Sequence, residues 1–156
     1  LVANERDAHQ KNLRKGRFSR PGYAFFITTN SKNRLPLFAD ASAARIILDS
    51  LKWLTDQGRI TLIAAVVMPD HLHFVMQLHT GTVQSVMHSL KSFTSNKINV
   101  LLGREGPLWE PQYHDHGIRN DEDLKESVRY CLENPVRKGL VEDFRGYPHW
   151  YCIYEI

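Results

Sequence analysis

Two apolar runs flank a Pro-Asp pair in the middle of the chain, and this stretch constrains the fold more than any other. Residues 59–68 read Arg-Ile-Thr-Leu-Ile-Ala-Ala-Val-Val-Met, and residues 71–78 read His-Leu-His-Phe-Val-Met-Gln-Leu. Pro69 and Asp70 between them are residues typical of tight turns. Two strand-like runs joined by so short a connection predict an antiparallel β-hairpin.

His71 and His73 open the second strand of this hairpin. Side chains alternate between the two faces of a strand, so both imidazoles should point to one side while Leu72 and Phe74 point into a core. Two neighbouring imidazoles can ligate one metal ion, or bind a phosphate when protonated. The alternative is a strand whose polar face happens to carry two histidines.

The other elements are predicted from composition and periodicity. Residues 23–29 are rich in aromatic and β-branched side chains and predict a first strand. Asp40 is typical of a helix N-cap, and apolar residues spaced three and four apart from there to Gln57 predict an amphipathic helix that ends at Gly58. Three further elements are predicted, a helix over 82–102, a short strand over 113–119 and a helix over 122–133.

The predicted order is therefore strand, helix, strand, strand, helix, strand, helix. Because one pair of strands is a hairpin, the sheet cannot be all parallel. The fold class that fits is α+β, a ferredoxin-like antiparallel sheet with helices on one face. We divide the chain of 156 residues into a basic N-terminal arm (1–20), one domain (21–141) and a C-terminal tail packed on that domain (142–156).

Composition is that of an ordinary globular protein, with 42% hydrophobic and 24% charged residues. No apolar run approaches the ~20 residues of a membrane-spanning helix, and two cysteines are too few for a disulfide framework. These features predict a cytoplasmic protein with no membrane partner. The net charge of +3 is mild, but basic residues gather in the arm, where they either hold phosphates or form a solvated tail. They are Lys11, Arg14, Lys15, Arg17 and Arg20.

Tyr130 and Asn134 lie four positions apart, which places them on one face of a helix. If that face looks toward His71 and His73, the amide oxygen can complete a mixed nitrogen and oxygen site suited to Mn²⁺ or Mg²⁺. The phenol is then a candidate covalent nucleophile. Taken alone, the tyrosine would be read as a packing residue, and an asparagine before Pro135 as a helix terminator.

Two segments carry a specific resemblance. Residues 68–75 (Met-Pro-Asp-His-Leu-His-Phe-Val) and 130–141 (Tyr-Cys-Leu-Glu-Asn-Pro-Val-Arg-Lys-Gly-Leu-Val) resemble signature blocks of the Y1 transposases related to IS200. They are most similar to those of the REP-associated tyrosine transposases. Residues 106–109 and 115–120 also resemble the linking motif of that branch. The resemblance covers about residues 20–150, nearly the whole chain.

The resemblance implies the HUH nuclease version of the ferredoxin-like sheet. It implies that His71, His73 and Asn134 bind a divalent metal, Mg²⁺ or Mn²⁺, although insertion-sequence relatives more often carry glutamine at the third position. It implies that Tyr130 forms a 5′-phosphotyrosine link to single-stranded DNA. The DNA of this branch is typically a palindromic repeat hairpin.

Residues for DNA contact are less well defined. The basic and polar side chains that we select are Arg14, Lys15, Arg17, Arg20, Arg34, Lys91, His116 and Arg119. His114 and His116 form a second His-x-His, which is a competing metal pair; alternatively, His116 and Arg119 contact the scissile phosphate or hold Tyr130. Trp109 is interpreted as a packing anchor, and Cys131 as a core residue.

The sequence thus predicts a metal-dependent, single-stranded DNA endonuclease and strand transferase, transposase-like, that cleaves at repeat hairpins through Tyr130. The alternative is a non-catalytic DNA-hairpin binding protein derived from such a transposase. A third possibility is a metal-binding regulatory domain without a DNA partner. Whether the chain acts as a monomer or a homodimer is left open.

Overall fold

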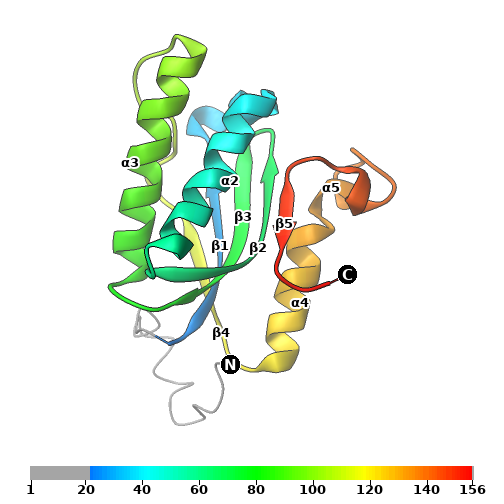
Figure 1. Ribbon diagram of the computed structural model, residues 1–156. Helices are drawn as coiled ribbons and strands as arrows, with labels where there is room; N and C mark the ends of the chain where they lie inside the picture. The colour runs from blue at the N-terminus through cyan, green and yellow to red at the C-terminus, as the bar shows by residue number, and fades with distance from the viewer. Residues whose placement is uncertain (1–21, 156) are drawn as a thin grey trace.

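One antiparallel sheet forms the middle of the molecule in the computed structural model, which describes residues 22–155 (Figure 1). The predicted basic arm, residues 1–20, lies outside the described residues. The strand order across the sheet is β4-β1-β3-β2-β5. The strands are β1 (Ala24–Asn30), β2 (Ile60–Met68), β3 (His71–Leu78), β4 (His114–Ile118) and β5 (Trp150–Cys152). The predicted hairpin is present as β2 and β3.

Strand β3 is the central strand of this sheet, and both of its neighbours pair with it along their length. β2 pairs with β3 from Met68 opposite His71, beside the Pro-Asp turn. On the other side, β1 pairs with β3 so that Thr28 lies opposite His73. The register therefore fixes which side chains of β1 can reach the histidines.

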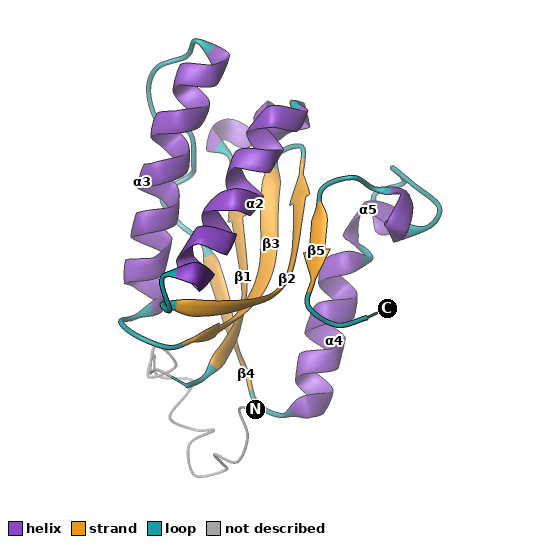
Figure 2. Cartoon of the chain, viewed as in Figure 1, coloured by secondary structure: helices purple, strands orange, loops and turns teal. Residues whose placement is uncertain are grey.

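Helices α2 (Ala41–Asp56) and α3 (Val83–Leu102) cover one face of the sheet (Figure 2). The Asp40 carboxylate caps α2 as predicted, accepting hydrogen bonds from two backbone N–H groups. Helix α3 ends at Gly103, whose φ of 65° closes the helix in the left-handed conformation. The largest fully buried side chains on this face come from both layers, and they include Phe25, Phe74 and Leu51.

Helix α4 (Asp121–Leu132) covers the opposite face, together with the short helix α5 (Asn134–Arg137). The prediction of helices on one face was therefore wrong. Strand β2 is apolar on both faces, and nearly all residues of β2 and β3 are buried, so each face needs a covering layer. A second cluster of buried side chains joins α4 to the sheet, formed by Ile63, Val66, Val75, Leu124, Val128 and Cys131.

The C-terminal segment closes the second layer. Phe144 and Tyr147 are buried against α4 and the sheet, and the Tyr147 hydroxyl donates a hydrogen bond of 2.7 Å to the Val67 carbonyl. The chain then forms β5, which pairs with β2 and was not predicted, since three residues are too few to show a strand pattern. Among residues 22–155, no helix is long and apolar enough to span a membrane.

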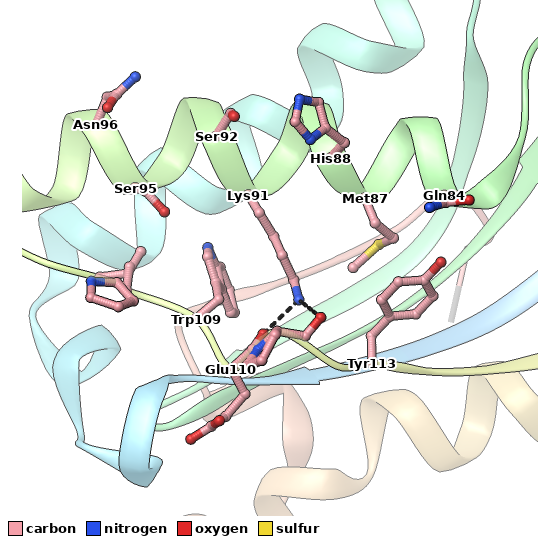
Figure 3. Close-up of a pocket in the computed structure, with 13 residues that line it drawn as sticks. Gln84, Met87, His88, Lys91, Ser92, Ser95, Asn96, Trp109, Glu110 and Tyr113 are labelled. Atoms are coloured by element: carbon pink, nitrogen blue, oxygen red, sulfur yellow. Dashed lines mark hydrogen bonds between the residues drawn. The ribbon is translucent and has the colours of Figure 1, made fainter.

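The loop after α3 is anchored to that helix by several side chains, among them Trp109 and Lys91. Trp109 is buried, packs on Phe38 with 4.8 Å between ring centroids, and donates from Nε1 to the Thr94 hydroxyl. This confirms Trp109 as a packing anchor. Lys91 reaches from α3 to the loop, where its ammonium donates a hydrogen bond of 2.8 Å to the Glu110 carbonyl (Figure 3). Two further carbonyls of the loop accept longer bonds from it.

Candidate active site

His71 and His73 lie side by side on the face of β3 that looks toward α4 and α5. Their ring centroids are 4.8 Å apart, and only 5% and 7% of the two residues' surfaces is exposed. Leu72 and Phe74 point to the other face, into the core beneath α2 and α3. Strand alternation thus separates the imidazoles from the core, as the sequence predicts.

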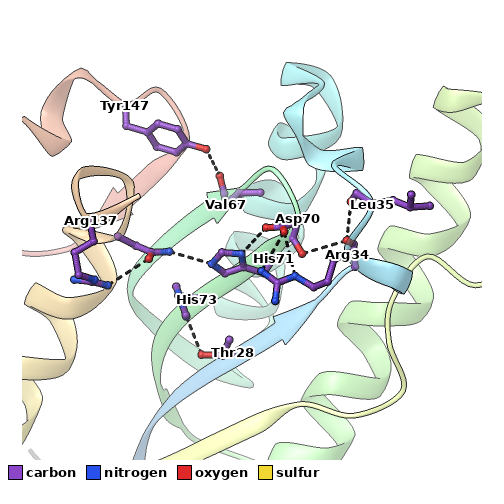
Figure 4. A network of polar contacts seen from close by, with 11 residues as sticks. Thr28, Arg34, Leu35, Val67, Asp70, His71, His73, Arg137 and Tyr147 are labelled. Atoms are coloured by element: carbon purple, nitrogen blue, oxygen red, sulfur yellow. Dashed lines mark hydrogen bonds and ion pairs between the residues drawn. The ribbon is translucent and has the colours of Figure 1, made fainter. Parts of the chain in front are cut away.

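A hydrogen-bond partner holds each imidazole through Nδ1 (Figure 4). His71 Nδ1 lies 2.7 Å from one oxygen of the Asp70 carboxylate. The other oxygen forms an ion pair with Arg34, with 3.0 Å between it and Nη2. His73 Nδ1 lies 2.8 Å from the Thr28 hydroxyl. With Nδ1 engaged, Nε2 is the nitrogen of each ring that can bind a metal, as is common for metal-binding histidines, and in His71 it meets the Asn134 carboxamide.

Both histidines are held in the neutral form, which is the form that binds metals. Burial lowers the pKa of His71 despite the opposing effect of Asp70. Burial, with the nearby His71 and the Arg137 cation, lowers the pKa of His73 to about 3. Burial disfavours the ionised Asp70, but hydrogen bonds from His71 and Arg34 outweigh it and the pKa of Asp70 is lowered. A neutral imidazole beside a carboxylate is suited to metal ligation, not to phosphate binding by charge.

Asn134 completes this group from the opposite layer. It begins α5, immediately after the chain leaves α4, and it is 3% exposed. Its Nδ2 donates a hydrogen bond of 3.0 Å to His71 Nε2. A half-turn about the Cβ–Cγ bond brings the carboxamide oxygen to the same place, because the two amide atoms occupy nearly equivalent positions.

Tyr130 lies one helical turn before Asn134, at the mouth of the site. Its ring centroid is 6.1 Å from that of His73 and 5.8 Å from that of Phe26, and 51% of the residue is exposed. A shallow cleft of about 490 Å³ adjoins it, lined also by Thr28 and His114. The Tyr130 side chain is therefore open to this cleft.

The donor atoms fit a divalent metal. Two imidazole nitrogens and one carboxamide oxygen form a neutral set that suits Mn²⁺ or Mg²⁺ completed by water or phosphate oxygens. Within residues 22–155, no three His, Cys, Asp or Glu side chains converge as a metal cluster. The competing pair is arranged differently, since His116 is exposed and its Nε2 lies 3.2 Å from Asp123.

The predicted DNA-contact residues have different surroundings. Arg14, Lys15, Arg17 and Arg20 lie outside the described residues. Arg34 is half-exposed and paired with Asp70, so it lies next to the histidines. The Lys91 ammonium is held by the carbonyls of the loop, and the residue is partly buried. Arg119 is exposed, and its backbone N–H donates to the same Asp123 that holds His116.

Four residues of the site were given no role by the sequence argument. Asp70 and Thr28 orient the imidazoles, Phe26 stacks on His73 with 5.4 Å between ring centroids, and Arg137 lies over Tyr130. Asp70 had a signal, since it directly precedes the first histidine. Thr28 and Phe26 had none, because only strand pairing brings β1 next to β3.

The fold and the site together define a class, the HUH proteins, in which a sheet presents two histidines separated by a hydrophobic residue beneath a helical tyrosine. The chain belongs to the IS200-like transposase family, whose profile matches residues 22–131.

Two relatives and one solved structure agree with this assignment. A REP-associated tyrosine transposase of Escherichia coli K12 is 26% identical over 129 residues, 81% of this chain and 74% of the relative. A Haemophilus influenzae protein named as such a transposase is 28% identical over 101 residues, and this chain spans only 56% of its length. The structure of a REP-associated tyrosine transposase bound to a REP hairpin superposes with a TM-score of 0.68 at 26% identity, covering 86% of this chain and 79% of that one.

Proposed function

We propose that this protein is a metal-dependent, single-stranded DNA endonuclease and strand transferase that acts at palindromic repeat hairpins. The observation that carries the proposal is the meeting of Tyr130 with His71, His73 and Asn134, from opposite layers of the fold, in one accessible site. Repeat hairpins are the substrate class because a structural relative is bound to one. The basic arm 1–20 and Arg34 are the proposed DNA contacts beside the domain 21–141.

The proposed reaction is a transesterification. The Tyr130 oxygen attacks phosphorus, so that a bond to the phenol oxygen forms while the bond from phosphorus to O3′ breaks. The phenolic proton passes to water, and O3′ leaves with the electron pair and takes a proton from water. A divalent ion on His71, His73 and Asn134 would supply Lewis-acid stabilisation of the charge at phosphorus. The phosphotyrosine bond conserves the energy of the phosphodiester bond, so rejoining the DNA requires no nucleoside triphosphate.

The test is formation of a covalent adduct on a labelled single-stranded repeat hairpin, with Mn²⁺, with Mg²⁺ and with a chelator. We expect a metal-dependent protein–DNA adduct on a denaturing gel, and its complete loss in Tyr130→Phe. Tyr154→Phe is the matched control, since Tyr154 is similarly exposed but lies against a different groove. Hairpin binding without any adduct in the parent would support the non-catalytic alternative, and an adduct in Tyr130→Phe would assign the nucleophile to another residue.

A further inference from the structure

We propose that Arg137 is a positioning residue that holds Tyr130 in the arrangement needed for attack, and that its contact with Asn134 helps to fix the guanidinium. This inference rests on the proposed function. Arg137 lies on α5, outside the set of residues that would bind metal or form the covalent link. Its guanidinium makes three separate contacts with the two functional residues.

The first contact covers the nucleophile's ring. The Arg137 guanidinium carbon lies 3.7 Å from the centroid of the Tyr130 ring, a cation–π stack. Phe26 meets the same ring edge-on, with the two ring planes at 81°. A tyrosine as exposed as this one would otherwise change rotamer on the picosecond to nanosecond scale. Contacts from two directions restrict that rotation.

The second and third contacts fix the guanidinium itself. Its Nη2 donates a hydrogen bond of 2.7 Å to the Tyr130 backbone carbonyl, near the C-terminal end of α4, and lies 3.4 Å from Asn134 Oδ1. Arg137 lies seven positions after Tyr130, and the chain turns at Glu133 between α4 and α5. The guanidinium is thus tied to the end of the helix that carries the nucleophile, and also to the carboxamide beside His71.

Attack in line with the leaving oxygen requires the phenol to be held in one direction. A displacement of about 1 Å in a reacting group can slow a reaction by about 100-fold. Removal of Arg137 should therefore slow the chemical step while leaving hairpin affinity nearly unchanged. A residue that only held DNA would show the opposite pattern.

The test compares Arg137→Ala with Arg129→Ala. Arg129 is an exposed arginine one position before Tyr130, and it lines a different groove. We expect single-turnover adduct formation to fall about 10–100-fold in Arg137→Ala, with hairpin affinity by gel shift within about twofold of the parent. Free guanidinium ion at millimolar concentration should restore part of the rate in Arg137→Ala only.

A readout independent of catalysis separates this inference from the proposed function. In protein labelled with 3-fluorotyrosine, the ¹⁹F resonance assigned by Tyr130→Phe should shift toward free fluorotyrosine in Arg137→Ala and stay unmoved in Arg129→Ala. If the parent forms no adduct, the proposed function is overturned, and this ¹⁹F resonance still tests whether Arg137 positions Tyr130. Any of three results would overturn the role of Arg137. They are an unmoved resonance in Arg137→Ala, an equal rate loss in Arg129→Ala, and a rate loss in Arg137→Ala that lost hairpin affinity fully explains.

Discussion

At the residue scale, the site depends on the atoms next to the functional groups as much as on those groups. Asp70 and Thr28 each engage the Nδ1 atom of one histidine, which turns both Nε2 atoms toward a ligand. Such outer contacts set the tautomer and the ring orientation of a metal-binding histidine. Arg34, which lies in the loop after β1, in turn holds Asp70 and so acts on His71 through that carboxylate.

Asp70→Asn should weaken metal binding. The amide still accepts a hydrogen bond from His71 but carries no charge and loses its ion pair with Arg34. Affinity for Mn²⁺, measured by calorimetry on the full chain, should fall about 10–100-fold. Asp143→Asn is the control, because Asp143 is also paired with an arginine but lies in the C-terminal segment. Equal Mn²⁺ affinity in Asp70→Asn and the parent would contradict an orienting role.

At the element scale, helix α4 decides where the nucleophile stands. Its apolar stripe, including Leu124, Val128 and Cys131, packs on the sheet and leaves Tyr130 at the edge of that contact. Cys131 is fully buried, and burial raises the pKa of its thiol well above the ordinary range, which confirms it as a core residue. The helix begins after the N-cap residue Asn120, whose side-chain oxygen accepts a hydrogen bond of 2.8 Å from the Asp123 N–H.

Loss of that cap should destabilise the fold modestly. Asn120→Ala leaves the Asp123 N–H without its side-chain acceptor, and we expect about 1 kcal/mol less free energy of unfolding in urea. Asn120→Asp retains an acceptor oxygen next to the positive end of the helix, so it should stay close to the parent. If both variants lose the same free energy, the cap bond is not the cause.

At the scale of the whole molecule, the sheet is covered on both faces, and the two layers have different tasks. Helices α2 and α3 provide the larger core, while α4, α5 and the C-terminal segment build the layer that meets the histidines. Tyr147 anchors that segment to β2 through its bond to the Val67 carbonyl. Burial raises the pKa of Tyr147 to about 12.

Tyr147→Phe should therefore have a pH-dependent effect. At pH 7 the variant should lose about 1 kcal/mol of unfolding free energy, because the Val67 carbonyl loses its donor. Since the phenol ionises near pH 10 when unfolded but only near 12 when folded, its contribution is present below pH 10 and lost as pH rises further. The parent's advantage should vanish by about pH 11.

Urea unfolding of both proteins from pH 7 to 11 measures this convergence. Tyr154→Phe is the control, since Tyr154 is half-exposed and not buried against β2. A constant difference between the parent and Tyr147→Phe over the whole range would contradict a buried, protonated phenol.

The sequence by itself determined the local structure and the identity of the central residues. Turn residues between apolar runs specified the hairpin, alternation placed His71 and His73 on one face, and the spacing of Tyr130 and Asn134 put them one helical turn apart. These properties depend on neighbours within a few residues, and the structure confirms the order of elements that follows from them. The roles in metal binding and catalysis stay predictions.

Only the tertiary structure decided which layers meet. The apolar stripe of α4 fits either face of a sheet in which β2 is apolar on both sides, so periodicity did not distinguish the two faces. Packing on the face opposite α2 and α3 brought Tyr130 to His73, strand register brought Thr28 there, and the turn at Glu133 returned Arg137 to the Tyr130 ring. Contacts between segments far apart in the chain leave no periodic signal, because they depend on how complete surfaces fit together.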